Sequence, residues 1–179
     1  MTMSLEQLLS QKRDTILRRW LDLIAGSRPT GDSPPVRDKA RFSNPEAHIT
    51  SRETAALYDE LLQNHMDSEK VCSSLDSILR IKAVQDLSPS QAIAIVFLLK
   101  EAIADGLAGE IEKQQLLGQW LEFESRIDRL ASLAFDIYMQ CRENIFQVRM
   151  SEVKAQKESA LRMLGLVETA GRKRAGAVE

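Results

Sequence analysis

The residues of this chain that could act as ligands or nucleophiles are few, and their spacing matches no catalytic or metal site. A haem-binding domain would need an axial ligand, usually histidine, and the two histidines, His48 and His65, stand among polar residues near predicted helix ends. We favour surface or capping roles for both. Neither follows a glutamate by three residues, as a helical carboxylate metal centre would require. We therefore expect no catalytic residue, metal or cofactor, with haem binding through His48 or His65 as the weaker alternative.

The two cysteines, Cys72 and Cys141, form neither a disulfide framework nor a zinc knuckle. Neither lies in a nucleophile signature. We expect both to serve as small apolar side chains in a reducing cytoplasm.

The composition is that of a globular domain, with 44% hydrophobic and 28% charged residues among 179. Twenty-four Lys and Arg against 26 Asp and Glu leave no bulk positive field for nucleic acid. The longest apolar run, residues 92–99, is too short to cross a bilayer, and the N-terminus lacks the pattern of a signal peptide. We expect a cytoplasmic protein without a transmembrane segment or a nucleic-acid partner.

Glycine and proline are distributed as in an all-α protein. No glycine occurs between Gly31 and Gly106, and no proline follows Pro89, whereas tight turns between strands usually need glycine. Apolar residues recur at helical spacing. They predict helices over residues 4–26, from 50 to about 62, over 70–84 and over 89–107, with a long loop over 26–49.

Three capping patterns support these helix starts. Ser4 with Gln7 and Thr50 with Glu53 fit the capping box, in which two side chains satisfy free backbone amides. The segment from Ser88 to Gln91 adds a proline at the first helical position, which makes it the sharpest local signal in the chain.

A last helix is predicted over about residues 116–160, since only Gly118 interrupts the stretch between Gly109 and Gly165. Residues 122–159 alone would span roughly 55 Å at about 1.5 Å per residue, more than a domain of this size needs. Apolar residues follow a heptad spacing, as in coiled coils. We predict a homodimer through this seam, whose main residues are Ile127, Leu130, Ala134, Ile137, Cys141 and Val148.

A second apolar stripe runs along a neighbouring face of the same helix, with Leu117, Leu121, Ala131, Phe135, Tyr138 and Ile145. One stripe is expected to face the parent domain and the other a partner. The domain is thus predicted over residues 1–160, followed by a flexible basic tail over 161–179.

Three stretches of the chain resemble the RsbT co-antagonist RsbRD N-terminal domain family, the sensory half of stressosome-type regulators. Residues 8–20 are similar to its leading helix, with the form L-x-x-x-R-D-x-I-L-x-x-W. Residues 42–45 with His48 resemble its F-x-N-P-x-x-H loop. The most specific stretch is 78–92, followed by 127–131 and 135–139, and the likeness covers about residues 5–155.

This resemblance implies a globin-like or bundle-like sensory domain without haem, which dimerises through its C-terminal helices. In many members the last helix enters a phosphorylatable STAS domain, whereas this sequence ends about twenty residues after the matched region. The resemblance therefore favours a stand-alone, non-enzymatic sensor or adaptor with a signalling or redox-complex protein as its unidentified partner. The alternatives are a haem- or small-ligand-binding globin-like protein and an accessory protein docking on a membrane redox complex.

Five polar residues of the family-like stretches are candidates for a functional role. They lie close to apolar stripes, and ion pairs and caps that fix a helix corner explain them best. A lined pocket or a partner surface is the functional alternative. The five are Arg80, Asp86, Ser88, Gln91 and Asp128.

Overall fold

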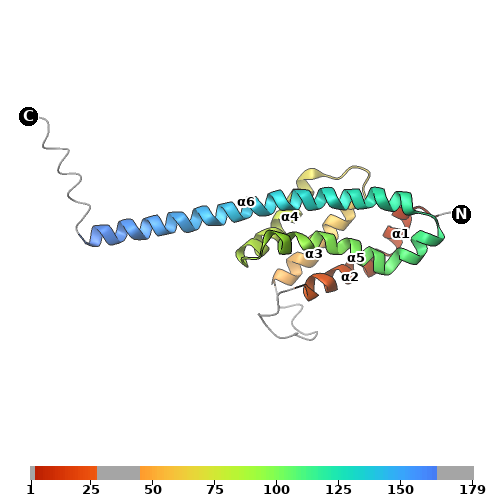
Figure 1. Cartoon of the computed structure of the whole chain (residues 1–179), viewed down its shortest axis with the longest axis horizontal. Helices are drawn as coiled ribbons and strands as arrows, with labels where there is room; N and C mark the ends of the chain where they lie inside the picture. The colour runs from red at the N-terminus through yellow and green to blue at the C-terminus, as the bar shows by residue number, and fades with distance from the viewer. Residues whose placement is uncertain (1–2, 28–44, 165–179) are drawn as a thin grey trace, which may run out of the picture. The chain divides into compact units, whose positions relative to one another are not determined.

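The computed structural model describes residues 3–27 and 45–164, in which every regular element is an α-helix (Figure 1). The prediction of an all-α protein is therefore confirmed, while a globin-like arrangement stays a prediction. Contacts divide the chain into two compact units, Met1–Cys141 and Arg142–Glu179, whose boundary falls inside the last helix. The domain over residues 1–160 stays a prediction. The helices are α1 (Leu5–Gln11), α2 (Arg13–Gly26), α3 (Pro45–Leu61), α4 (Ser68–Val84), α5 (Pro89–Lys113) and α6 (Leu117–Met163).

The predicted first helix is two helices, α1 and α2, joined at Lys12. Its capping box is confirmed, since the side chains of Ser4 and Gln7 each accept from the other residue's backbone amide. The break carries no glycine or proline, so the sequence gives no warning of it. A tertiary contact supports it: the carbonyl of Leu9, in the last turn of α1, accepts the hydroxyl of Tyr58 from α3 at 3.0 Å.

The third helix begins at Pro45, five residues before the predicted start at Thr50. Proline suits the first turn because its ring fixes φ and it lacks the amide that would stay unpaired there. Thr50 and Glu53 are buried inside the helix, so the predicted capping box is wrong. The predicted loop therefore ends before residue 45, and residues 28–44 lie outside the described part.

The corner between α4 and α5 is fixed by local signals. The capping box of Ser88 and Gln91 with Pro89 is confirmed. Asp86 has φ of 54°, a left-handed conformation that reverses the chain before this cap. α5 continues to Lys113, beyond the predicted end near residue 107, because burial of Leu107 and Ile111 offsets the low helix propensity of two glycines.

The core of the first unit lies between α2, α3, α4 and α5. α2 packs on α5 and α3, and α3 packs on α4. The largest buried side chains include Trp20, Tyr58 and Tyr138. The indole of Trp20 donates to the carbonyl of Ile95 at 2.7 Å, so its one polar atom is paired inside the core.

The first half of α6 closes this core along one side (Figure 1). Its side chains reach α1 through Gln119, which accepts from the amide of Leu5 at 2.8 Å, and the end of α3 through Arg126, which donates to the carbonyl of Leu61 at 3.2 Å. Its apolar face is buried, so α6 is an integral core helix of the first unit.

This burial corrects the predicted dimer seam. Ile127, Leu130, Ala134 and Cys141 are buried within the first unit, and Ile137 is half-buried. A helix that covers its own core and a coiled-coil helix share the same three-and-four spacing, so the pattern alone could not separate them. Of the six predicted seam residues, only Val148 is exposed, at 57%.

The second unit is described over residues 142–164, of which 142–163 form the remaining turns of α6. No described side chain of this unit is buried. The helix continues to Met163, three residues into the predicted tail, and residues 165–179 of that tail lie outside the described part. The exposed large apolar side chains are Phe146, Val148, Met150, Val153, Met163 and Leu164.

Within the residues that the structure describes, no helix has the length and apolar character needed to cross a membrane.

Substitutions at two of the predicted seam residues should lower stability by very different amounts. Leu130→Ala removes a side chain that is 2% exposed and should lower the free energy of unfolding by about 2–5 kcal/mol. Val148→Ala should change it by less than about 0.5 kcal/mol, as exposed positions do. Urea unfolding followed by circular dichroism measures both, and equal losses would contradict the core assignment of Leu130.

Candidate functional site

The polar residues singled out in the sequence are not gathered into one site. Arg80 pairs with Asp76 one turn earlier on α4, at 2.7 Å. Asp128 pairs with Lys100 of α5, also at 2.7 Å. Ser88 and Gln91 form the cap of α5, and Asp86 takes the left-handed position beside it. The structural interpretation, caps and ion pairs around a corner, accounts for these residues.

Both histidines are exposed, His48 in α3 and His65 in the connection between α3 and α4. Neither points from the core into an enclosed space, as an axial ligand of a buried haem would. Within residues 3–27 and 45–164, no group of three or more His, Cys, Asp or Glu is placed to hold a metal ion.

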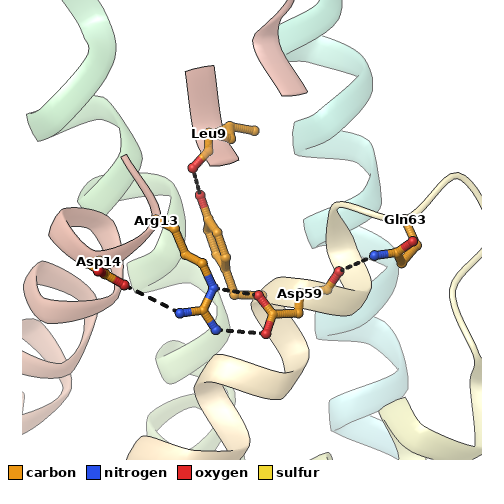
Figure 2. Close-up of polar contacts among 6 residues, drawn as sticks. Leu9, Arg13, Asp14, Asp59 and Gln63 are labelled. Carbon is orange, nitrogen blue, oxygen red and sulfur yellow. Dashed lines mark hydrogen bonds and ion pairs between the residues drawn. The ribbon is translucent and has the colours of Figure 1, made fainter. Parts of the chain in front are cut away.

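A polar network ties the α1–α2 break to α3 (Figure 2). Arg13 donates two hydrogen bonds to the Asp59 carboxylate, each at 2.7 Å, and lies 3.4 Å from Asp14. The hydrogen bond with Asp59 raises the pKa of Arg13. Tyr58 lies beside this pair with its hydroxyl on Leu9, and burial raises its pKa. These contacts hold α1, α2 and α3 together at the break between α1 and α2. The family-like pair Arg13 and Asp14 lies at this break.

A shallow polar hollow of about 550 Å³ lies between α3 and α4. Three charged side chains of its lining already pair: Lys70 lies 3.6 Å from Glu60, and Asp59 holds Arg13. Ser73 and Ser74 complete the wall beside Lys70. We assign this hollow to the packing of the two helices.

An apolar groove of about 820 Å³ lies between α5 and α6 of the first unit. Two aromatic side chains stand at it, Phe97 on α5 and Phe135 on α6, and they are 47% and 46% exposed. Exposed aromatic rings that share one hollow are typical of interaction surfaces. The groove is lined by Pro89, Ser90, Ile93, Ala94, Phe97, Leu98, Glu101 and Phe135; we call it the α5–α6 groove.

The sequence analysis missed the role of Phe97. Phe97 lies in the apolar run of residues 92–99, in which the sequence gives no sign that one side chain is exposed. Phe135 belongs to the second stripe of α6, in which Leu117, Leu121 and Phe135 are exposed. Ala131 and Tyr138 of the same stripe are buried, so the boundary of the core runs through this stripe. The sequence shows that these apolar residues form a stripe on one face of the helix. It does not show which of them face the core and which face solvent.

A tyrosine joins α6 to the corner beside the groove. The ring of Tyr138 is fully buried, and its hydroxyl donates to the carbonyl of Leu87. Leu87 lies between Asp86, which has the left-handed backbone, and Ser88, the cap of α5. The position of α6 near the end of the first unit is therefore tied directly to the backbone of this corner.

One turn further along α6, Cys141 makes a second contact with α4. Its thiol donates to the Asp76 carboxylate at a sulfur–oxygen distance of 3.6 Å. Burial raises the pKa of Cys141, and the negative charge of Asp76 raises it further. The same carboxylate holds Arg80, so α4 and α6 share one polar cluster at the end of the first unit.

The comparisons with known proteins assign the chain. Residues 14–153 match the model of the RsbT co-antagonist protein rsbRD N-terminal domain. The chain belongs to this family. The family is one of regulatory signalling domains, and the matched region of this RsbRD N-terminal domain extends beyond the first unit to residue 153 of α6.

A relative of this RsbRD N-terminal domain is an uncharacterised protein of Archaeoglobus fulgidus. It is 26% identical over 147 residues, which cover 82% of this chain and 87% of the relative. No solved structure matches the chain.

The network around Tyr58 predicts unequal costs for two conservative changes. Tyr58→Phe leaves the buried carbonyl of Leu9 without its donor and should lower the free energy of unfolding by about 1–3 kcal/mol. Asp59→Asn weakens an ion pair whose partners are partly exposed, so its loss should stay below about 1 kcal/mol. Thermal and urea unfolding measure both; a larger loss for Asp59→Asn would contradict this ranking.

The environment of Cys141 predicts slow reaction with thiol reagents. Because its pKa is raised, it holds less thiolate than an ordinary cysteine at any pH below that value. In the folded chain Cys141 should react with iodoacetamide several-fold more slowly than Cys72, and Asp76→Asn should raise its rate. Peptide mass spectrometry at pH 8 follows each cysteine, and faster labelling of Cys141 than of Cys72 would contradict the prediction.

Proposed function

We propose that this RsbRD N-terminal domain is a non-enzymatic sensory or adaptor module that acts as a homodimer and transmits its state to a protein partner. The carrying observation is the hydrogen bond from Tyr138 to the carbonyl of Leu87, which couples the α4–α5 corner to α6. A change in the core that moves this corner changes the position of α6, and a partner reads that change.

Two features support transmission by this route. The corner joins two helices through a left-handed residue, Asp86, and the cap of α5 at Ser88, and the hydroxyl of Tyr138 binds the carbonyl between them. Tyr138 and Cys141 are the points where α6 contacts the corner and α4 just before the first unit ends. The signalling class of the family agrees with a transmitting role.

Exposed apolar side chains of α6 support a protein partner and a second copy. Phe146, Met150 and Val153 are all exposed, and the family match includes them. Large apolar side chains that repeat along one helix in water are typical of an association surface.

The coupling is tested with Tyr138→Phe, which keeps the ring and removes the hydroxyl. Hydrogen–deuterium exchange of the corner and of α6 around residue 138 should rise several-fold, because one hydrogen bond is worth about 1 kcal/mol. Tyr58→Phe is the matched control, since it loses a hydroxyl bond elsewhere in the core and should leave the corner unchanged. No added exchange at the corner in Tyr138→Phe would contradict the coupling.

The signalling role is tested by recovering the tagged full-length chain from its native cells. A regulatory protein should co-purify, in an amount that differs between the wild-type chain and Tyr138→Phe. Recovery of membrane redox-complex subunits in equal amounts with both would favour the accessory-protein alternative. Titration with haemin addresses the other alternative: a Soret band lost on replacing His48 or His65 would favour a haem protein.

A further inference from the structure

Six exposed residues of the second unit follow a regular pattern along α6. Positions 143, 146, 150, 153, 157 and 160 are spaced alternately by three and four residues, so they share one side of the helix. At about 100° per residue they fall within an arc of about 100°. We call these six residues the second-unit seam: Glu143, Phe146, Met150, Val153, Lys157 and Ala160.

This helical segment has little to stabilise it within one chain. No side chain that the structure describes over residues 142–164 is buried. Most helical stability in proteins comes from the burial of an apolar face, yet Phe146 is 63% exposed and Val153 is 57% exposed. A second helix that covers the seam would remove both side chains from water and stabilise the helix.

The two charged residues of the seam disfavour a parallel pair with a second copy. In a parallel pair in register, each residue of the seam faces the same residue of the other copy. Glu143 would then face Glu143, and Lys157 would face Lys157. Like charges placed opposite one another weaken association, and here they would occupy two of the six positions.

An antiparallel pair gives each of these charges an opposite neighbour. The pair is centred where Met150 lies opposite Val153 of the other copy, and in this register Lys157 of the other copy lies opposite Phe146. The lysine stem then covers the aromatic ring. Glu143 precedes Phe146 by three residues, about 4.5 Å along the axis, so its carboxylate is within reach of the same ammonium group.

We propose that two copies of this RsbRD N-terminal domain associate through an antiparallel pair of second-unit seams, with Met150 opposite Val153 of the other copy. The inference rests on the homodimer of the proposed function and names its surface and its direction. The pair is twofold, so it closes the dimer and contains the contact between Glu143 and Lys157 twice. It uses residues of the second unit alone, and a second copy supplies the matching charges.

Zero-length crosslinking distinguishes the two directions. A carbodiimide joins a carboxylate directly to an amine, so it links Glu143 to Lys157 only where the two groups meet. Within one chain the two residues are 14 apart, about 21 Å along the helix, and a parallel copy repeats that separation. A mixture of unlabelled and nitrogen-15-labelled full chains should therefore give this isopeptide between copies, as mass spectrometry would show. Lys157→Arg should remove the crosslink and retain the dimer.

Charge reversal tests the same contact in solution. Glu143→Lys and Lys157→Glu should each weaken the dimer roughly 5- to 10-fold, and the double variant should restore it, because the pair forms again with its charges exchanged. Glu152→Lys is the matched control, since it makes the same charge change at an exposed position outside the seam. Sedimentation equilibrium of the full chain measures the dissociation constants, with circular dichroism to show that each variant is folded.

Photo-crosslinking gives a second measurement of the direction. A benzoylphenylalanine at position 146 should crosslink to the other copy around residue 157. Crosslinks from 146 to 146 of the other copy, single charge reversals that act no more strongly than Glu152→Lys, or a monomeric wild-type chain would each overturn the inference.

Failure of this inference is distinguishable from failure of the proposed function. A parallel dimer would overturn the antiparallel pairing and leave the homodimer standing. A monomeric chain would remove the homodimer, whereas the signalling role is tested separately by partner recovery and its response to Tyr138→Phe.

Discussion

The structure depends on the burial of one face of α6 by the first unit. Ile127, Leu130, Ala134 and Tyr138 turn that face inward. Polar contacts from the same helix reach α1, the end of α3, α5, the α4–α5 corner and α4. Because this helix contacts so many elements, a shift of any of them changes packing or hydrogen bonding along it. That property makes α6 suited to report on the state of the domain.

The polar contacts in the core divide into two kinds. Trp20, Tyr58 and Tyr138 each bury an aromatic ring and use their single polar atom to bind a backbone carbonyl. Such bonds fix the relative position of two elements, since a carbonyl left without its donor inside the core is costly. The ion pairs of Arg13, Arg80 and Lys100 are more exposed and have little effect on stability. Those of Arg13 and Lys100 join two helices, whereas that of Arg80 lies within α4.

The two units differ in charge and in burial. The first has a core and an acidic surface, and the second is described as a helical segment with exposed apolar and basic side chains. A helix without buried side chains gains little from tertiary packing. Its large apolar side chains are therefore left exposed, and this exposure is the basis of the association proposed above.

The sequence by itself determined the helical class, the cap at Ser88 and the extent of the last helix, because capping and the distribution of glycine and proline act locally. It also carried the family likeness, which the family match confirms. Only the tertiary structure decided which stripe of α6 faces the core, where the first helix breaks at Lys12, and that Thr50 lies inside α3. The physical reason is that the spacing of apolar residues along a helix fixes a face but not its neighbour. Whether Leu130 meets its own chain or a second copy depends on contacts between residues far apart in the sequence.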